Sequence, residues 1–383
     1  MSPMSIRPAT VAVNAMFLDP GVSGGVETYV RALVPEMHRQ APRIRFVVCT
    51  TGRGAAALRA DPAFAGIDVA QLPAEEGQRL RRGRAEQLTL PRVARRRGAD
   101  LLWSPASTAP LRAPGMRTVI TMHDATMFEH ATFGRVTTQA MRFTMLGPAR
   151  RADGLIVGSA AARDQICRAL GLDPARFTVV HHGAGRPGPV AAPEPGVRAT
   201  YGLRDARVIL CVAAKRPHKN QELLIRALHG VPDDVVLVLA GHPEPYDAEL
   251  RTLAAAEGVA GRVRFADYVP DDELEGLFAL ADVAAFPSLA EGFGLPIAEA
   301  MARGLPVVAA DTPVFREVGK GAARYVDPRD PVAAAAALTA ALDAGPDVRA
   351  ASRTQGGAFT WEASAAGTLA VFERVLGDRE DGR

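Results

Sequence analysis

The chain has 383 residues, which is too long for one average hydrophobic core and therefore predicts two or three domains. Its formal net charge of +3 is too small to indicate a nucleic-acid partner, and no run of about 18 apolar residues predicts a transmembrane helix. The first residues lack a basic segment followed by a long apolar one, so we expect no secretory signal. Three scattered cysteines predict buried free thiols in a reducing cytoplasm, not a disulfide framework or a metal cluster: Cys49, Cys167 and Cys211.

A buried strand is predicted over residues 10–17, and a glycine-containing turn at 21–26 leads from it into an amphipathic helix over 27–37. This order is typical of the first βα turn of a Rossmann-like domain, where glycines let a phosphate or a substrate approach the backbone. On the residues alone, Gly24 and Gly25 are equally well explained by a plain tight turn.

Further apolar segments alternate with helix-like or loop-like sequence, as expected for the strands of a parallel sheet. They lie at residues 45–49, 100–105, 118–124 and 154–159. An Ala-Asp pair precedes three predicted strands along the chain, which indicates a shared architecture and not a sequence repeat; the aspartates are Asp100, Asp153 and Asp282.

His123 and Asp124 come directly after one of these strands. Open α/β sheets place their ligand crevice at the carboxyl ends of the strands, so this position favours a contact with a ligand. A histidine with a purely structural role is the alternative that the position leaves open.

The segment between Arg79 and Arg97 holds two arginine clusters around a short apolar Leu-Thr-Leu. A solvated basic face explains this composition. A patch for anionic lipid or for an acidic acceptor explains it too, because arginine clusters are attracted to anionic surfaces. A peripheral contact with the inner face of the membrane is therefore an open alternative.

Residues 186–196 are rich in proline and glycine between periodic segments, which is typical of a linker. We place an N-terminal Rossmann-like domain at residues 1–186, the linker at 187–199 and a second Rossmann-like domain at 200–360. A final helix within 361–383 is expected to close the fold.

The second domain opens with a buried strand over 207–214, and a basic loop follows it. Lys215, Arg216, His218 and Lys219 lie together at this strand-to-helix connection, where they form a cationic cradle suited to a diphosphate. A polar surface loop is the alternative.

The segment from Phe286 to Val308 reads as the end of a strand, a glycine-containing loop and a helix that starts at Pro296. Its glycines permit close approach, and the free N–H groups of a helix start attract phosphate. Glu291 lies in this loop and Glu299 lies one turn into the helix. Because an acid would repel a diphosphate, sugar hydroxyls are the natural partners of acids beside an anion site. Any strand-loop-helix unit of an α/β protein could carry the same residues, and that interpretation stays open at this point.

The run from Glu291 to Pro296, with Glu299, resembles the Glu-x7-Glu motif of the retaining glycosyltransferase family 4. The usual context is present too, as Pro287-Ser288 before it and the strand up to Val308 after it, and the resemblance spans about residues 24–375. It implies an α/β fold of the GT-B type, with two Rossmann-like domains whose parallel sheets face each other across a cleft. The second domain would bind the nucleotide sugar and the first the acceptor, with the final helix crossing back to the first.

The resemblance implies transfer of a hexosyl or deoxyhexosyl group from a nucleoside diphosphate sugar, with retention and with neither metal nor cofactor. The acceptor hydroxyl would belong to a glycan, a lipid-linked glycan or a small natural product. Catalytic roles fall to four residues, which reach the sugar or neutralise the leaving diphosphate: His123, Arg216, Lys219 and Glu291. Donor-binding roles fall to Gly24, Gly25, Lys215, Val269, Gly292, Phe293, Gly294, Leu295 and Glu299.

The basic loop departs from the family pattern. Many members have a glycine or an arginine before the lysine, where this chain has Ala213. Lys219 therefore carries over more securely than Arg216, and Lys215 is a candidate substitute. A nucleotide-sugar epimerase of the same architecture and a non-catalytic nucleotide-sugar-binding subunit are the rival hypotheses. The sugar, the base, the acceptor and the oligomeric state do not follow from the sequence.

Overall fold

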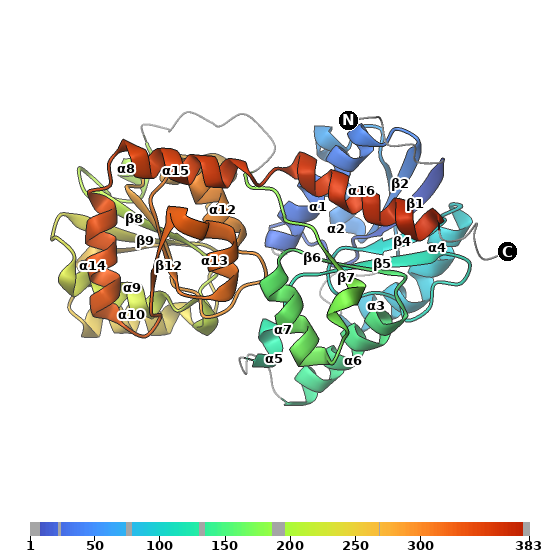
Figure 1. The fold of residues 1–383 in the computed structure, drawn as a ribbon, viewed down its shortest axis with the longest axis horizontal. Coiled ribbons are helices and arrows are strands. Elements are labelled where there is room, and N and C mark those ends of the chain that lie inside the picture. Colours follow the sequence, from blue (N-terminus) through green and yellow to red (C-terminus); the bar gives the residue numbers. More distant parts are fainter. Residues whose placement is uncertain are drawn as a thin grey trace. The chain divides into compact units, whose positions relative to one another are not determined.

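The computed structural model describes residues 8–21, 24–73, 79–129, 135–185, 196–267 and 269–377. The chain divides into two compact units (Figure 1): unit 1 joins Met1–Gly183 with Thr360–Arg383, and unit 2 is Ala184–Phe359. Most of the predicted linker, residues 187–195, lies outside the described residues. Its last part is not a linker, because α8 (Val197–Thr200) is a helix in which Val197 is buried against α11 (Asp271–Leu280).

Unit 1 is built on a seven-stranded parallel sheet with the strand order β3-β2-β1-β4-β5-β6-β7. The strands are mostly buried and apolar, as expected where helices cover both faces of a parallel sheet. They are β1 (Ala9–Asn14), β2 (Ile44–Thr50), β3 (Asp68–Gln71), β4 (Leu101–Ser104), β5 (Arg117–Met122), β6 (Gly154–Val157) and β7 (Phe177–Val179). The main helices are α1 (Gly25–Gln40), α2 (Gly52–Ala60), α3 (Arg79–Arg84), α4 (Leu90–Arg96), α5 (Thr126–Glu129), α6 (Arg135–Arg151), α7 (Ala160–Leu170) and α16 (Trp361–Gly377).

Unit 2 has a six-stranded parallel sheet in the order β10-β9-β8-β11-β12-β13. Its strands are β8 (Arg207–Val212), β9 (Val235–Ala240), β10 (Val263–Ala266), β11 (Val283–Phe286), β12 (Val307–Ala310) and β13 (Ala323–Val326). Its remaining helices are α9 (Gln221–Ala227), α10 (Asp247–Ala256), α12 (Leu295–Ala302), α13 (Pro313–Gly319), α14 (Pro331–Leu342) and α15 (Pro346–Gly357). The prediction of two α/β domains with parallel sheets is confirmed.

The three Ala-Asp pairs perform one structural task in both units. Each aspartate precedes a strand and accepts a hydrogen bond from a backbone N–H near the start of the neighbouring strand: Asp100 from Thr10 at 3.0 Å, Asp153 from Thr118 at 2.8 Å, and Asp282 from Val208 at 2.8 Å. A carboxylate thus satisfies a ladder donor at the amino end of the sheet. The shared architecture that the sequence indicated has this physical basis.

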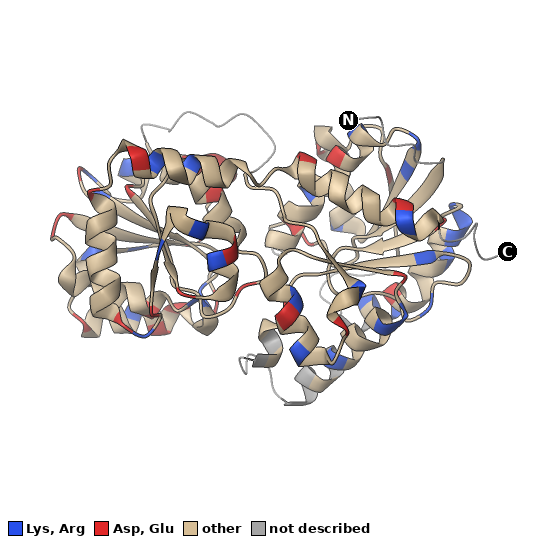
Figure 2. Cartoon of the chain, viewed as in Figure 1, with Lys and Arg blue, Asp and Glu red and all other residues tan. Residues whose placement is uncertain are grey.

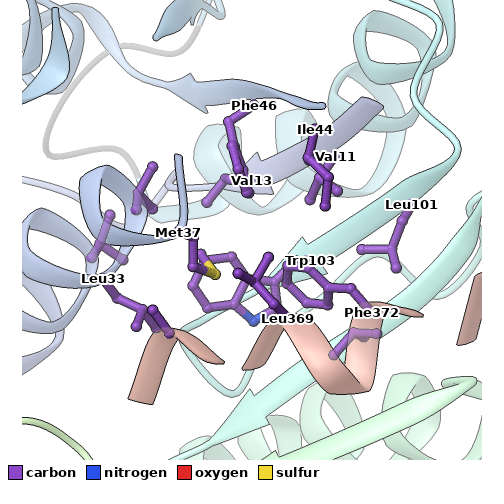
Figure 3. Close-up of a cluster of buried hydrophobic side chains, with 14 of the residues drawn as sticks. Val11, Val13, Leu33, Met37, Ile44, Phe46, Leu101, Trp103, Leu369 and Phe372 are labelled. Carbon is purple, nitrogen blue, oxygen red and sulfur yellow. The ribbon is translucent and has the colours of Figure 1, made fainter. Parts of the chain in front are cut away.

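The core of unit 1 includes α16, although this helix comes from the far end of the chain. Leu369 and Phe372 are fully buried among side chains of α1, β1, β2 and β4 (Figure 3). The ring of Phe372 meets that of Trp103 edge-on, with 5.7 Å between centroids. Helix α16 also packs along α1 and against β5 and β6. The hydrophobic core of unit 1 therefore includes side chains of this C-terminal helix.

The basic segment around residues 79–97 forms α3, a π-helical turn (η2, Ala85–Thr89) and α4. Arg92, Arg95 and Arg96 are exposed, and Figure 2 shows basic residues over this region. Arg97 instead pairs with Asp68, with 2.6 Å between Nη1 and Oδ2. Within the described ranges, no helix combines the length and the apolar character needed to cross a membrane.

Candidate active site

In unit 2, the basic loop after β8 and the loop after β11 are pinned together. Residues Pro217–Lys219 form a short 3-10 turn (η4), and Asn220 follows it in the left-handed region with φ of 55°. The buried side chain of Asn220 donates to the carbonyl oxygens of Pro287, at 3.1 Å, and Pro328, at 2.9 Å. The N–H of Leu289 donates to the carbonyl of His218 at 2.8 Å. These bonds fix the positions from which Lys219 and Glu291 project.

Lys219 and Glu291 form an ion pair, with 2.7 Å between Nζ and Oε1. Their side chains are only 19% and 16% exposed, so the pair is shielded from most of the solvent and its field is screened less than on an open surface. The structure thus brings together the predicted phosphate-binding lysine and the first glutamate of the Glu-x7-Glu motif, which lie 72 residues apart in the sequence.

Glu291 leads into the glycine loop and α12. Gly294 has φ of 80°, and a Cβ there would lie 2.9 Å from the Phe315 ring, so both backbone and space require glycine. The helix starts at Leu295, one residue before the predicted start, and Pro296 still lies in its first turn, where its missing N–H costs no hydrogen bond. Gly292 and Leu295 flank this turn, and Glu299 lies one turn into α12 on a partly exposed position.

Phe293 and Val269 are placed differently from the other predicted donor-binding residues. The Phe293 side chain is buried and meets the Phe359 ring edge-on, 5.4 Å between centroids, so it supports the loop from inside. Val269 is partly exposed just before α11. The neighbouring Tyr268 lies outside the described residues.

The other two cations of the basic loop have acidic partners of their own. Arg216, about half exposed, pairs with Glu244, with 2.5 Å between Nη2 and Oε1. Lys215 is fully buried, and its Nζ donates to the carbonyl of Gly241 at 2.9 Å and to Asp267 at 3.2 Å. The proposed use of Lys215 as a donor-binding cation therefore needs correction, because its ammonium group holds the β8, β9 and β10 connections together inside the unit.

In unit 1, the predicted glycine turn stands at the start of α1. Gly24 has φ of 58° and precedes the helix, and Gly25 is its first residue; residues 22–23 lie outside the described ranges. Glu27 occupies the first turn, where its Oε2 accepts from the Gly21 N–H at 3.1 Å and its Oε1 pairs with Arg31 at 2.9 Å. The predicted glycine turn therefore includes the Glu27 carboxylate, which is hydrogen-bonded to the backbone of Gly21.

His123 lies at the carboxyl end of β5 and uses both ring nitrogens inside unit 1. Nε2 lies 2.6 Å from the carbonyl oxygen of Pro105, and Nδ1 lies 3.3 Å from Nε2 of His182. Because a carbonyl only accepts, Nε2 of His123 donates to it, and Nδ1 of the neutral ring accepts from His182. The contact of His123 with a donor sugar stays a prediction. To bind a sugar hydroxyl through a ring nitrogen, His123 would have to give up its hydrogen bond with Pro105 or with His182.

The environment of the two histidines disfavours their protonated forms. Desolvation by the surrounding protein lowers the pKa of His123 below its ordinary 6.5 and that of His182 well below it, although Asp124 acts in the opposite direction on His123. Their rings also pack on Tyr29, whose centroid lies 5.2 Å from that of His123 and 4.5 Å from that of His182. Burial raises the pKa of the Tyr29 hydroxyl to about 12, so this neighbour carries no charge near neutral pH.

This pair predicts a loss of stability of unit 1 below neutral pH. Because both folded pKa values lie below 6.5, the unfolded chain binds more protons, and the free energy of unfolding decreases as the pH falls from 6.5 toward the folded values. Each histidine contributes at most about 1.4 kcal/mol per pH unit in that window. Urea unfolding between about pH 7.5 and pH 5.5 measures the effect.

Replacing His182 with glutamine removes one titrating group and is expected to flatten this pH dependence. His229→Gln is the matched control, since His229 is exposed in unit 2 beside Glu257. Equal pH slopes in the wild type and the His182 variant would contradict this assignment.

Two family models match the chain. The model for Glycosyl transferases group 1 matches residues 198–356, and the model for Glycosyltransferase Family 4 matches residues 23–184. The chain belongs to the group 1 (family 4) glycosyltransferases. The resemblance inferred from the Glu291–Glu299 motif is thereby confirmed.

Curated relatives carry glycosyltransferase names. A D-inositol 3-phosphate glycosyltransferase of Streptomyces griseus is 30% identical over 69% of this chain and 63% of its own length. The O-antigen chain mannosyltransferase RfbU of Salmonella typhimurium is 28% identical over 55% of this chain and 57% of its own. The chain spans less than two thirds of the length of the relatives that it matches first, between 37% and 64%.

Solved structures support the same fold for this family 4 member. Sucrose-phosphate synthase from Thermosynechococcus elongatus superposes with a TM-score of 0.76 at 20% identity, covering 97% of this chain and all of that one. Anabaena HepE in complex with UDP-glucose gives a TM-score of 0.69 at 20% identity, covering 98% of this chain and all of that one. These matches confirm the predicted GT-B fold.

Among the described residues, no three His, Cys, Asp or Glu side chains form a group that could hold a metal ion.

His182 contacts the candidate site residue His123, and the sequence patterns did not single it out. It follows the short strand β7 by three residues, in the same relation that drew attention to His123 after β5. The rule that polar residues at carboxyl ends of parallel strands gather at one edge could have identified it.

Proposed function

We propose that this family 4 member is a retaining glycosyltransferase that moves a hexosyl or deoxyhexosyl group from a nucleoside diphosphate sugar to a hydroxyl acceptor, without a metal. The observation that supports this most is the Lys219–Glu291 pair beside the Gly292–Gly294 turn and the start of α12. It combines a cation and helix N–H groups for a diphosphate with a carboxylate for sugar hydroxyls. The names of the relatives agree with transfer of a glycosyl group.

In the proposed mechanism, the bond between the anomeric carbon and the diphosphate oxygen breaks as the ring gains oxocarbenium character. The electron pair goes to the diphosphate, so preorganised positive charge there lowers the barrier. Lys219 supplies it together with the backbone N–H groups at the start of α12, and Arg216 adds to it when it leaves Glu244. Glu291 would then hold sugar hydroxyls and Glu299 the ribose.

The acceptor hydroxyl would attack on the face that the diphosphate leaves, and its proton would pass to the leaving phosphate oxygen. The new bond to the anomeric carbon then replaces the broken one with retention. We assign the acceptor to unit 1 and the donor to unit 2, and we assign His123 a contact with the donor sugar. No side-chain nucleophile is required.

Product analysis without an acceptor tests the proposal. The protein would be incubated with UDP-glucose, GDP-mannose, dTDP-rhamnose and ADP-glucose, and the products separated by chromatography. A transferase is expected to hydrolyse one donor slowly to the free sugar and the nucleoside diphosphate. Conversion of one sugar nucleotide into another would favour the epimerase, and tight binding without turnover would favour a binding subunit.

We also propose a peripheral contact of unit 1 with anionic lipid in the cytoplasm. Leu88, 48% exposed in the π-helical turn, lies between Arg84 and Arg92, so an apolar side chain is flanked by exposed cations. Such a surface gains about 1 kcal/mol per basic residue near an anionic bilayer. Sedimentation with phosphatidylglycerol vesicles is expected to carry the protein down at low salt, whereas phosphatidylcholine vesicles are not. Equal sedimentation with both would contradict this contact.

A further inference from the structure

A second carboxylate site lies at the carboxyl edge of the unit 1 sheet. Its centre is Glu86, in the π-helical turn η2. Glu86 Oε1 accepts from Nδ2 of Asn14, at 2.8 Å, and from Oγ1 of Thr108, at 3.0 Å. Asn14 ends β1, is 2% exposed and also donates to Ser104 Oγ at the end of β4, at 3.2 Å.

The loop after β4 connects this carboxylate with His123. Within it Ser107 has φ of 64°, a conformation that costs a non-glycine residue free energy and that surrounding contacts must maintain. Ser107 Oγ accepts from the His123 N–H at 3.1 Å, and Pro105 accepts from the His123 ring. The next residue, Thr108, donates to Glu86. One strained loop therefore holds Glu86 and His123 in fixed positions at the same edge of the sheet, where parallel α/β sheets bind ligands.

The turn that carries Glu86 is itself unusual. Residues Ala85–Thr89 form a π-helical turn between α3 and α4, and such turns occur frequently at functional sites. The neighbouring Gln87 fixes the far end of the loop, because it donates to the Ala109 carbonyl at 3.1 Å and accepts from the Leu111 N–H at 2.9 Å. The turn thus holds the loop with Gln87 and directs Glu86 to the strand ends.

Within the described residues, no cation lies within ion-pair distance of the Glu86 carboxylate. Its two hydrogen-bond partners among the described residues are a neutral amide, that of Asn14, and a neutral hydroxyl, that of Thr108, and both contact Oε1. Within the part of the chain that the structure describes, Oε2 has neither a hydrogen-bond nor an ion-pair partner. A carboxylate that served only to close the loop would be expected to use both oxygens or to pair with an arginine. Oε2 is therefore available to accept hydrogen bonds from a ligand.

We propose that Glu86 binds the acceptor, and that it selects a neutral polyol or sugar by accepting hydrogen bonds from its hydroxyls. The inference rests on the proposed transferase function and specifies its acceptor. A carboxylate without an ion-pair partner among the described residues repels a phosphate group, so this subsite disfavours a phosphorylated acceptor. In this respect the proposed acceptor differs from the one that the name D-inositol 3-phosphate glycosyltransferase gives for the relatives.

Two measurements distinguish failure of the Glu86 proposal from failure of the transferase function: acceptor binding tests the first, and donor hydrolysis tests the second. Saturation-transfer NMR would measure binding of matched probes to the wild type with the productive nucleoside diphosphate present: myo-inositol against inositol 3-phosphate, and glucose against glucose 6-phosphate. Binding of the neutral member of a pair is expected, at least 10-fold tighter than that of its phosphate. Glu86→Gln keeps an oxygen for Asn14 and Thr108 but replaces Oε2 with a donor, and is expected to weaken acceptor binding 10-fold or more, while donor hydrolysis stays within about twofold.

Glu36→Gln is the matched control, because Glu36 lies in unit 1 and its partners among the described residues are side chains of its own helix, Arg39 and Gln40. It is expected to bind acceptor as the wild type does, and a circular-dichroism melting curve checks the fold of each variant. The proposal is overturned if the wild type binds no neutral probe or prefers the phosphates, or if the Glu86 variant binds acceptor unchanged. Absence of donor binding and hydrolysis in the wild type would instead refute the transferase function itself.

Discussion

Lys219→Ala is expected to lower kcat for donor turnover by about 10²- to 10³-fold, which corresponds to about 2.7–4 kcal/mol of lost transition-state stabilisation. Lys219 is the one cation of the basic loop whose partner, Glu291, itself belongs to the candidate sugar site, at 2.7 Å. In the proposed mechanism, this ammonium group neutralises the growing charge of the leaving diphosphate. Initial rates of nucleoside diphosphate release measure the effect.

Two companion variants decide why activity is lost. Lys219→Ala leaves the shielded Glu291 carboxylate without its cation, and that charge alone could repel a diphosphate. If repulsion were the cause, adding Glu291→Gln would restore binding of the nucleoside diphosphate, which lacks the sugar that Glu291 would hold; if the cation itself is required, the double variant still binds it weakly, as we expect. Arg226→Ala is the control, because Arg226 lies exposed on α9 and pairs with Glu222. Full activity in Lys219→Ala would remove the lysine from the mechanism.

Phe372→Ala is expected to destabilise unit 1 by about 3–5 kcal/mol, the usual cost of deleting a buried aromatic side chain. Phe372 is fully buried against Trp103 in the core shown in Figure 3, although it lies near the end of the chain. The two tryptophans of the sequence, Trp103 and Trp361, both lie in unit 1. Tryptophan fluorescence during urea unfolding therefore reports unit 1 specifically.

Ala370→Gln is the matched control for this variant, since Ala370 lies on the exposed side of α16 and glutamine is also a good helix former. Its midpoint should stay close to that of the wild type. An unchanged midpoint in Phe372→Ala would mean that α16 is not part of the unit 1 core.

The sequence was sufficient for the fold class and for the strand-loop-helix segment that carries the candidate donor site. Strands buried on both faces read as continuous apolar runs, and their alternation with helices predicts parallel sheets. The Glu291–Glu299 run was recognisable because its glycines and its proline have strict backbone requirements, which Gly294 illustrates with its positive φ.

Side-chain direction within short loops could not be predicted in the same way. Lys215 and Lys219 lie four residues apart in one basic loop, yet Lys215 turns inward to Asp267 while Lys219 turns to Glu291. The acids that decide this come from distant strand ends. The sequence did not reveal Glu86 for a related reason. It lies inside an arginine-rich segment whose composition indicated a basic surface. Its partners Asn14 and Thr108 are distant in the sequence, and the sheet brings them to it.

Calorimetric titration of UDP, GDP, dTDP and ADP into the wild type and Lys219→Ala tests the central claim most directly, namely that unit 2 binds a nucleoside diphosphate at the Lys219–Glu291 pair. We expect one nucleotide to bind the wild type and to bind the variant at least 10-fold more weakly. The bound nucleotide should raise stability by about 2.7 kcal/mol at about 100 times its Kd. If no nucleotide binds the wild type, with or without magnesium, or if the variant binds equally well, the assignment of this site as a diphosphate cradle is wrong.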